Sequence, residues 1–266
     1  MHAHPRAIEW RKEFLQDTVK KIQIGQINAI NRYPIKSLAG ESLTSCAIEP
    51  YGLLGDRWGA FYDETKEGWS RFVTARNIPA MMSYQAKFMD GDIRVTSPDG
   101  REFGWDGQLL GDIQQLTETP IAMSRLKEPN PEDPRLMSVD AASILLVTDA
   151  SLRQLEAQWG KDVDQRRFRG NFVVTLNADA PLEPEWIGSR LTIGDVRLQV
   201  DSLCERCVMI TMDPDTLDKE PSLLKKVHQE FNTCLGAYAS VISTGQIKIG
   251  DKVILESSAT IAGQDN

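Results

Sequence analysis

The sequence predicts an α+β fold that is mainly β, with a few peripheral helices. Between residues 43 and 100, short candidate strands alternate with turn signals at intervals of about ten residues, which is typical of an antiparallel sheet or barrel. A Gly-Asp turn between short strands occurs at 192–196 and again at 248–253, as at the rims of small barrels. Segments with helical spacing of apolar residues are few, so we expect the helices to lie at the edges of a β-rich body.

Composition limits the classes of protein that the chain can represent. The 266 residues are 41% hydrophobic and 26% charged, which is ordinary for a globular protein and argues against general disorder. The net charge of −8 argues against a general nucleic-acid binder. No stretch approaches the roughly 18 apolar residues of a membrane span, and the first 26 residues lack the apolar core of a secretion signal. We therefore expect a cytoplasmic protein whose four cysteines are reduced.

Histidine is too scarce for most histidine-based sites. Of the three histidines, His2 and His4 lie near the N-terminus, and only His228 is internal, in a polar helical pattern. A zinc site with several histidine ligands is excluded unless the terminus folds inward, and a Ser-His-Asp hydrolase would depend on His228 alone.

The first half of the chain combines one expected helix with several strands. Residues 7–22 have the apolar spacing of an amphipathic helix, and a strand-like pattern runs from Ile22 to Tyr33-Pro34. Asp90-Gly91 and Asp99-Gly100 are hairpin-type turns. The further expected strands are 43–49, Trp58–Tyr62, Arg71–Ala75, Ser83–Met89 and Asp92–Ser97.

A proline-rich segment, 127–134, separates the two halves and predicts a linker or a long surface loop. Beyond it, a helix over Asp149–Trp159 is expected to end at Gly160, and a second helix spans 220–231. The expected strands of this half are Ile144–Val147, Phe172–Leu176, Tyr238–Ser243 and Lys248–Leu255, followed by a frayed tail. We therefore divide the chain into an N-terminal extension (1–21), a first β-rich unit (22–126), a second unit (127–256) and a tail (257–266).

The pair Cys204 and Cys207, in the sequence Cys-Glu-Arg-Cys, is the first candidate for chemistry, because the adjacent Arg206 favours a thiolate. A thioredoxin-type dithiol needs a helix after the motif, whereas 208–212 has a strand-like pattern. A zinc site would need Cys46 and Cys234, which lack paired spacing. A soft thiolate ligand to a cofactor-bound transition metal, and a plain pair of buried thiols, remain open.

Basic residues form the other candidates. Lys36 and Ser37 follow a strand and could bind an oxyanion. Four positive charges in 161–171 precede an apolar strand, as in a phosphate or carboxylate clamp. The segment 52–58 lacks the spacing of nucleotide-binding glycine loops, and its Arg57 beside Asp56 suggests a solvated pair of surface charges.

Taken in chain order, these motifs resemble the MOSC family, whose domain is related to the C-terminal part of molybdenum cofactor sulfurase. The first half resembles the β-barrel domain that commonly precedes a MOSC domain. Within the family, the chain resembles the amidoxime-reducing component and its bacterial relatives. The resemblance covers roughly residues 24–255. The stretches that carry it are Tyr33–Leu38, Gly52–Trp58, Phe72–Pro79, Leu145–Leu152, Phe168–Asn171, Cys204–Cys207, Asp213–Thr216 and Gly250-Asp251.

The resemblance implies two β-rich units, the second a distorted barrel, with a molybdenum-pterin cofactor in the cleft between them. It implies that Cys207 is the thiolate on molybdenum, flanked by Arg206 and Glu205. The positions that it assigns to the pterin and its phosphate are Lys36, Ser37, Arg57 and Arg169, with Thr148, Asn171 and Tyr238 as further lining positions. Gly170 stands where the family usually has proline and Leu217 where it usually has glycine, so we expect the two loops to differ locally from those of the family.

The activity that the resemblance implies is reduction of N-hydroxylated small molecules, from N–OH to N–H. Some bacterial relatives end in an iron–sulfur domain, and only a short tail follows Leu255 here, so we expect a separate ferredoxin- or cytochrome-like electron donor. Two alternatives are a persulfide carrier or cofactor-binding module without turnover, and a thiol–disulfide protein that uses Cys204 and Cys207.

Overall fold

The main body of the structure is a closed barrel of seven strands. The computed structural model describes residues 19–130, 133–134, 136–137 and 142–258. Around the barrel the order is β12-β11-β15-β14-β13-β17-β1, and pairing of β1 with β12 closes it. Neighbours are antiparallel except β11 and β12, and the short β2 (Glu41–Leu43) extends the sheet beside β1. The barrel strands are β1 (Val19–Arg32), β11 (Ile144–Thr148), β12 (Phe172–Leu176), β13 (Arg190–Ile193), β14 (Val196–Glu205), β15 (Cys234–Ser243) and β17 (Lys252–Ser258).

Strand β1 shows how an irregular pattern still makes a barrel strand. Ile24, Ile27 and Ile30 are all fully buried, although their spacing of three breaks the alternation of a regular strand. Register shifts in the pairing with β17 and β12 restore the inward direction after each break. At Gly25, an added Cβ would collide with the carbonyl group of Thr175, so the close approach of β12 requires glycine there.

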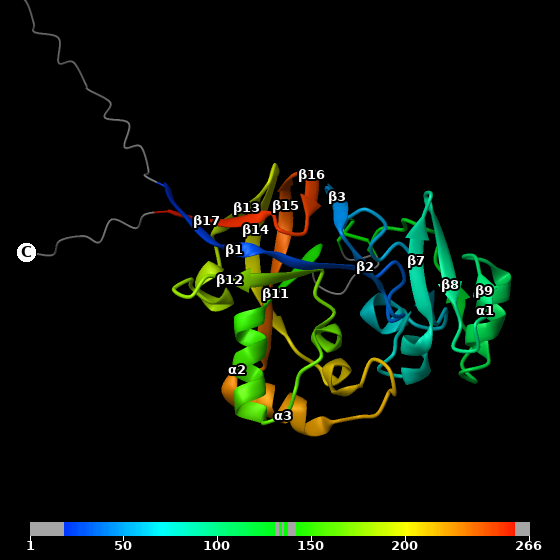
Figure 1. Ribbon diagram of the computed structural model, residues 1–266. Coiled ribbons are helices and arrows are strands. Elements are labelled where there is room, and N and C mark those ends of the chain that lie inside the picture. The colour runs from blue at the N-terminus through cyan, green and yellow to red at the C-terminus, as the bar shows by residue number, and fades with distance from the viewer. Residues whose placement is uncertain (1–18, 131–132, 135, 138–141, 259–266) are drawn as a thin grey trace, which may run out of the picture.

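A second β-rich region packs beside the barrel and holds its own core (Figure 1). The hairpin β7–β8 turns at Asp90-Gly91 as expected, and β9 follows the turn at Asp99-Gly100. Three short sheets make up the region and its junction with the barrel: β7-β8-β9, β10-β5-β6 and β16-β3-β4. Their strands are β3 (Ser45–Glu49), β4 (Gly52–Leu53), β5 (Phe61–Tyr62), β6 (Phe72–Val73), β7 (Gln85–Met89), β8 (Asp92–Thr96), β9 (Glu102–Phe103), β10 (Ala122–Met123) and β16 (Gly245–Lys248).

The two halves of the chain share strands. β1 and β2 come from the first half, yet they form part of the sheet that also contains β11–β15 and β17. Similarly, β3 pairs with β16 from the C-terminal end. The bounds of the two units and their linker stay predictions, and the described part of 127–134 contains no helix or strand.

The part of the chain that the structure describes contains three α-helices, and they lie at the periphery, where we expected helices. α2 (Asp149–Trp159) has the predicted bounds and ends at Gly160, whose left-handed φ of 78° suits glycine. α3 (Pro221–Glu230) packs against α2 below the barrel (Figure 1). α1 (Gly107–Gln114) was not predicted. Its signal was present, because the Asp106 carboxylate caps the first turn.

Several local predictions need correction. Residues 19–22 of the expected helix are strand, while 7–18 lie outside the described residues. Of the expected tail, 257–258 still belong to β17, and 259–266 are not described. The strand-like segment after Cys207 is a short 3-10 helix, Val208–Thr211. Across the described ranges, no helix is long and apolar enough to cross a membrane.

Candidate functional site

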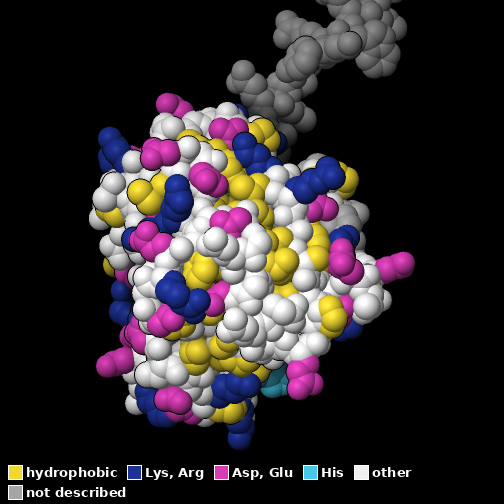
Figure 2. Space-filling model, turned by 90° about the vertical axis from the view of Figure 1, so that its right-hand side faces the viewer, with side chains coloured by type: hydrophobic (Ala, Val, Ile, Leu, Met, Phe, Trp, Pro, Cys, Tyr) yellow, Lys and Arg dark blue, Asp and Glu magenta, His cyan; other side chains and the backbone are white. Residues whose placement is uncertain are grey.

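A cleft of about 890 Å³ is lined by residues of both the barrel and the second β-rich region. Its lining is strongly basic in an acidic protein. Among the described lining residues, one acidic residue, Glu205, contrasts with seven cationic residues, which are Lys36, Arg57, Lys66, Arg76, Arg167, Arg169 and Arg206. On the face formed by the β7–β9 region, positive and negative side chains are instead interspersed (Figure 2). The cleft therefore concentrates positive potential where an anionic ligand could bind.

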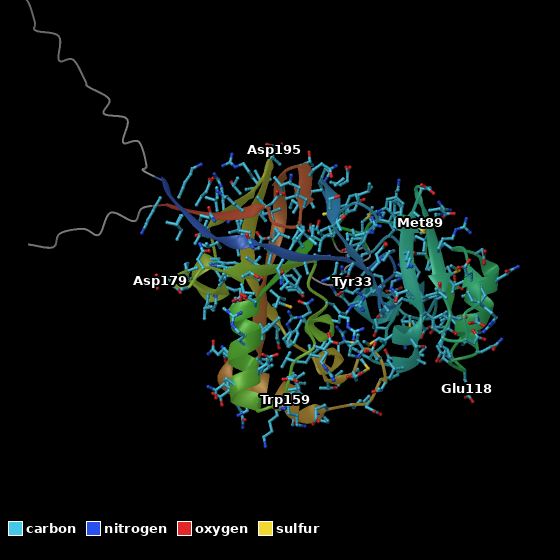
Figure 3. All side chains as sticks on the ribbon, in the orientation of Figure 1. Tyr33, Met89, Glu118, Trp159, Asp179 and Asp195 are labelled. Carbon is cyan, nitrogen blue, oxygen red and sulfur yellow. The ribbon has the colours of Figure 1, made fainter. Side chains whose placement is uncertain are left out.

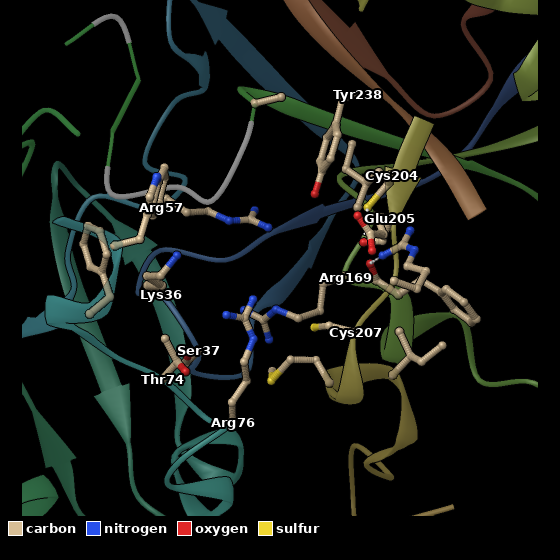
Figure 4. A pocket seen from close by; sticks show the side chains of 18 of the residues that line it. Lys36, Ser37, Arg57, Thr74, Arg76, Arg169, Cys204, Glu205, Cys207 and Tyr238 are labelled. Atoms are coloured by element: carbon tan, nitrogen blue, oxygen red, sulfur yellow. Dashed lines mark hydrogen bonds between the residues drawn. The ribbon is translucent and has the colours of Figure 1, made fainter. Parts of the chain in front are cut away.

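Eight of the nine site residues that the sequence suggested line this cleft. They come from segments far apart in the chain, and Figure 4 shows Lys36, Arg169 and Cys207 pointing into the same space. The eight residues are Lys36, Ser37, Arg57, Arg169, Asn171, Arg206, Cys207 and Tyr238.

Thr148 is the exception, because it does not line the cleft. The side chain is fully buried, and its Oγ1 donates to Glu183 Oε1 at 2.9 Å. The same oxygen accepts the Ser151 N–H at 3.1 Å and so caps α2. The structure thus gives Thr148 a structural role at the start of α2.

A buried carboxylate, Asp56, joins three of the segments that form the cleft. It accepts hydrogen bonds from the Tyr33 N–H at 2.6 Å, from Arg57 Nη1 at 2.6 Å and from Asn171 Nδ2 at 3.2 Å. The Asp56 side chain is 3% exposed and that of Arg57 16%. The interpretation of Asp56 and Arg57 as a solvated surface pair is therefore wrong.

Two arginines stack on the ring of Tyr33, which lies near the middle of the molecule (Figure 3). The guanidinium carbon is 4.8 Å from the ring centre for Arg57 and 4.2 Å for Arg169. Both arginines have left-handed backbone angles, with φ of 51° and 52°, which is uncommon for long side chains. Burial raises the pKa of the Tyr33 hydroxyl, although the charges of Arg169 and Arg57 oppose that rise. Tyr33 therefore stays neutral and serves as an aromatic support for two cations.

Lys36 and Ser37 form the adjoining part of the wall. Both are buried, at 5% and 6% exposure. The Lys36 ammonium lies 4.9 Å from the ring centre of Phe72 and 5.9 Å from that of Trp69. Aromatic faces thus hold this cation at the cleft surface.

The opposite wall carries the two cysteines of the Cys-Glu-Arg-Cys motif in different environments. Cys204 is 2% exposed within the core, whereas Cys207 is partly exposed and lies immediately before the 3-10 helix. All four cysteines are free thiols. The environments favour Cys207 as the thiol available to a ligand.

Arg206, between those cysteines, is buried and only partly satisfied. Its Nε donates to the Leu235 carbonyl at 2.7 Å, and Nη1 donates to the Phe168 carbonyl at 2.9 Å. Nη2 is buried without a hydrogen-bond partner among the described residues. A buried cationic donor without a partner lowers the stability of the folded protein. A ligand that places a hydrogen-bond acceptor beside Nη2 would recover that free energy.

Arg167 clamps the loop that follows Cys207. Its Nη1 donates to the Thr211 carbonyl at 3.0 Å, and its Nη2 lies 2.8 Å from the Asp213 carboxylate. The backbone N–H of Thr216, with a further contribution from Arg167, holds the pKa of Asp213 below its ordinary value. A lowered pKa means that this stabilisation is complete above the unfolded-state pKa and is lost only as pH falls through the lower folded value. The clamp is therefore intact at neutral and mildly acidic pH.

Replacing Arg167 by methionine should lower the free energy of unfolding by about 1.5–3 kcal/mol, because charged hydrogen bonds to a mostly buried guanidinium are lost. Urea unfolding would measure this change. Arg166→Met is the matched control, because Arg166 binds Asp164 and Asp215 with a half-exposed side chain and should cost about 0.2–1 kcal/mol. Equal losses in the two variants would contradict the clamp.

Sequence reasoning missed several lining residues, although a signal existed for some of them. Arg76 and Thr74 lie in the stretch 72–79, which entered only as part of the family resemblance. Both face the cleft near Ser37 in Figure 4. Trp69 and Lys66 lie in a loop without any recognised motif.

Comparisons with known proteins agree with this architecture. Residues 24–151 match the MOSC N-terminal beta barrel domain, and residues 133–254 match the MOSC domain. The zebrafish (Danio rerio) protein named mitochondrial amidoxime-reducing component 1 is 34% identical, covering 91% of this chain and 88% of its own. Mitochondrial amidoxime reducing component 2 of Macaca fascicularis is 25% identical over 93% of this chain and 88% of its own. A molybdenum cofactor sulfurase of Drosophila mojavensis is 34% identical over 68% of this chain but only 22% of its own.

A solved structure extends the agreement to the fold. The crystal structure of the YuaD protein from Bacillus subtilis matches with a TM-score of 0.50 at 12% identity, and the match covers 90% of this chain and 99% of that protein. Together with the zebrafish relative and the two matched domains, this places the barrel and the region beside it in one known architecture. The chain belongs to the MOSC-domain family, with a MOSC N-terminal beta barrel domain preceding its MOSC domain.

Proposed function

We propose that this protein is a molybdenum-cofactor-dependent reductase that converts N-hydroxylated small molecules from N–OH to N–H. The observation that carries the proposal is the partly exposed Cys207 thiol in a cleft lined by seven cationic side chains. Relatives named amidoxime-reducing components, which match most of the chain, support this choice of reaction. When bound, the molybdenum centre would supply the two-electron chemistry that removes oxygen.

The residues of the cleft fit such a cofactor. A thiolate is a ligand that suits a soft metal centre, and we assign that role to Cys207. The terminal phosphate of the pterin is anionic, and we assign its binding to Lys36, Ser37, Arg57 and Arg169. Among the described residues the Nη2 of Arg206 has no hydrogen-bond partner, and it offers a further donor in the cleft that Cys207 also lines.

Electrons are assigned to a separate donor protein, ferredoxin- or cytochrome-like. Once Cys207 binds the metal, the other cysteines of these 266 residues are Cys46, Cys204 and Cys234. A cluster held by four cysteines therefore has too few ligands in this sequence. The protein's own contribution is to hold the cofactor and to admit a small substrate to the cleft.

A second candidate function is a persulfide carrier or a cofactor-binding module without turnover. Arg206 precedes Cys207 in the sequence and lines the same cleft, which favours this function, because a nearby guanidinium stabilises a persulfide anion as well as a metal-bound thiolate. A relative named molybdenum cofactor sulfurase makes this alternative worth testing.

Metal analysis after expression in a host that makes the molybdenum pterin separates the two functions. A reductase should contain roughly one molybdenum per chain and should reduce an amidoxime with a chemical electron donor. Cyanide-labile sulfur without molybdenum would instead support the carrier. Stoichiometric molybdenum with no reduction of any N-hydroxylated compound would overturn the reductase and favour the binding module.

A further inference from the structure

We propose that Trp69 is a stacking platform at the rim of the cleft and selects substrates whose N-hydroxylated group is attached to a flat aromatic ring. This inference rests on the proposed reductase function and names the substrate class of the same cleft. Trp69 is carried by a loop that is a built structure with its own hydrogen bonds.

The loop between β5 and β6 is closed at its base and braced inside. The Asp63 N–H donates to the Arg71 carbonyl at 2.8 Å, so the two ends of the loop are tied together. The Asp63 carboxylate accepts from Thr65 Oγ1 at 2.6 Å and pairs with Lys66 Nζ at 2.9 Å. These bonds hold the pKa of Asp63 at about 2, so the brace stays ionised at neutral pH. At the turn, the Ser70 hydroxyl donates to the Glu67 carbonyl at 2.7 Å.

Trp69 is presented by this loop rather than buried by it. The residue is 40% exposed and lines the cleft, while Phe72 beneath it is 5% exposed. Their ring centres are 5.7 Å apart with a tilt of 42°, a favourable aromatic arrangement that fixes the indole orientation. Because the indole is already held in place, little further conformational entropy is lost when a ligand stacks on its exposed face.

Trp69 lies nearer to solvent than the groups that we assign to the cofactor, which lie deeper in the cleft. Lys36, Asn171 and Arg206 are all less than 9% exposed, whereas Trp69 lies where the cleft meets solvent. A cleft of about 890 Å³ is near the top of the range of about 300–1,000 Å³ for small-molecule sites, so it has room for a cofactor and a substrate together. The ring of an entering substrate would therefore meet Trp69, and the excess of cations favours neutral or anionic substrates over cationic ones.

Trp69 also touches Lys36, which raises a competing explanation. The Lys36 ammonium is 5.9 Å from the Trp69 ring centre and 4.9 Å from that of Phe72. If Trp69 served only to hold Lys36, its loss would weaken cofactor binding and would affect all substrates equally. If Trp69 is instead a platform for substrate, its removal should weaken the binding of flat aromatic substrates only, and the cofactor should be retained.

The experiment compares Trp69→Ala and Trp69→Phe with the wild type on two uncharged amidoximes, one with an aryl group and one with a linear alkyl group. For Trp69→Ala, we expect the KM for the aryl amidoxime to rise about five- to tenfold, with kcat and the alkyl KM within about twofold of wild type. Trp69→Phe should restore most of the aryl affinity. Molybdenum content should be unchanged in both variants.

The control is Ile187→Ala, which removes an equally exposed apolar side chain (40%) outside the cleft lining and should leave both KM values unchanged. Equal changes in both KM values for Trp69→Ala, or loss of molybdenum, would overturn the platform. Calorimetric titration of the aryl amidoxime separates the two proposals. Wild-type protein that binds it without reducing any N-hydroxylated compound refutes the reductase, whereas full reduction with unaltered aryl affinity in Trp69→Ala refutes only the platform.

Discussion

Replacing Cys207 by alanine is expected to reduce molybdenum from roughly one atom per chain to background and to abolish reduction of N-hydroxylated compounds. The thiol is the one soft ligand that we assign to the metal, and the cationic side chains around it cannot substitute for a thiolate. Since Cys207 is partly exposed at the start of a short 3-10 helix, its truncation leaves no cavity in the core. Metal analysis and an amidoxime reduction assay on the folded variant would measure both effects.

Cys204→Ala is the matched control for this result. Cys204 is 2% exposed, and its thiol makes only a weak contact of 3.7 Å with the Glu205 carbonyl. The variant should retain molybdenum and activity. Similar losses from both substitutions would point to a dithiol that uses both cysteines, whereas full activity in Cys207→Ala would refute its assignment as the metal ligand.

Elements with local signals were predictable from the sequence. α2 was confirmed to the residue, because an apolar face, a Thr cap at its start and a glycine at its end all lie within a short stretch of chain. The strand Phe172–Leu176 was equally clear as a short apolar run, and the hairpin at Asp90-Gly91 followed from its turn residues. In each case neighbouring residues decide the structure.

Features that depend on long-range contacts were harder to predict from the sequence. A strand from Ile22 onward was predicted, but its partners were not: β1 closes the barrel by pairing with β12 and β17, strands more than a hundred residues away. The spacing of three between its buried isoleucines also gave no sign of the bulges that turn them inward. The adjacent charges of Asp56 and Arg57 suggested solvation, whereas tertiary contacts bury the aspartate. α1 was not predicted: no element was assigned between the turn at Asp99-Gly100 and residue 127, although Asp106 caps the first turn of this short helix.

The candidate site depended more on family resemblance than on spacing. Residue chemistry alone suggested a thiolate in the pair Cys204 and Cys207 and an anion clamp in the basic segment around Arg169. Only the resemblance singled out Cys207 and placed both features in one cleft. The resemblance could not supply Trp69, whose loop carries no recognised motif, nor the clamp formed by Arg167. Thr148 lies next to the right region in sequence, yet its side chain turns to cap α2.

Replacing Asp56 by alanine should lower the free energy of unfolding by about 3–5 kcal/mol, because it leaves a mostly buried charge and two buried donors without their acceptor. The groups affected are Arg57 Nη1, the Tyr33 N–H and Asn171 Nδ2, each from a different cleft-forming segment. Urea unfolding at pH 7 would measure the loss. Glu230→Ala, which breaks a helical pair with Lys226 near the surface, should cost at most about 1 kcal/mol.

Asp56→Asn distinguishes stability from the arrangement of the site. An asparagine oxygen can still accept from the Tyr33 N–H, but the negative charge that pairs with the Arg57 guanidinium is gone. We therefore expect a smaller loss of stability than in the alanine variant, together with weaker retention of the anionic cofactor, because Arg57 and Arg169 stack on the same tyrosine. Unfolding curves for Asp56→Ala that overlay those of the wild type would show that this carboxylate does not hold the cleft together. A destabilised Asp56→Asn protein that still retains its full molybdenum would separate the fold of the cleft from its capacity to bind the cofactor.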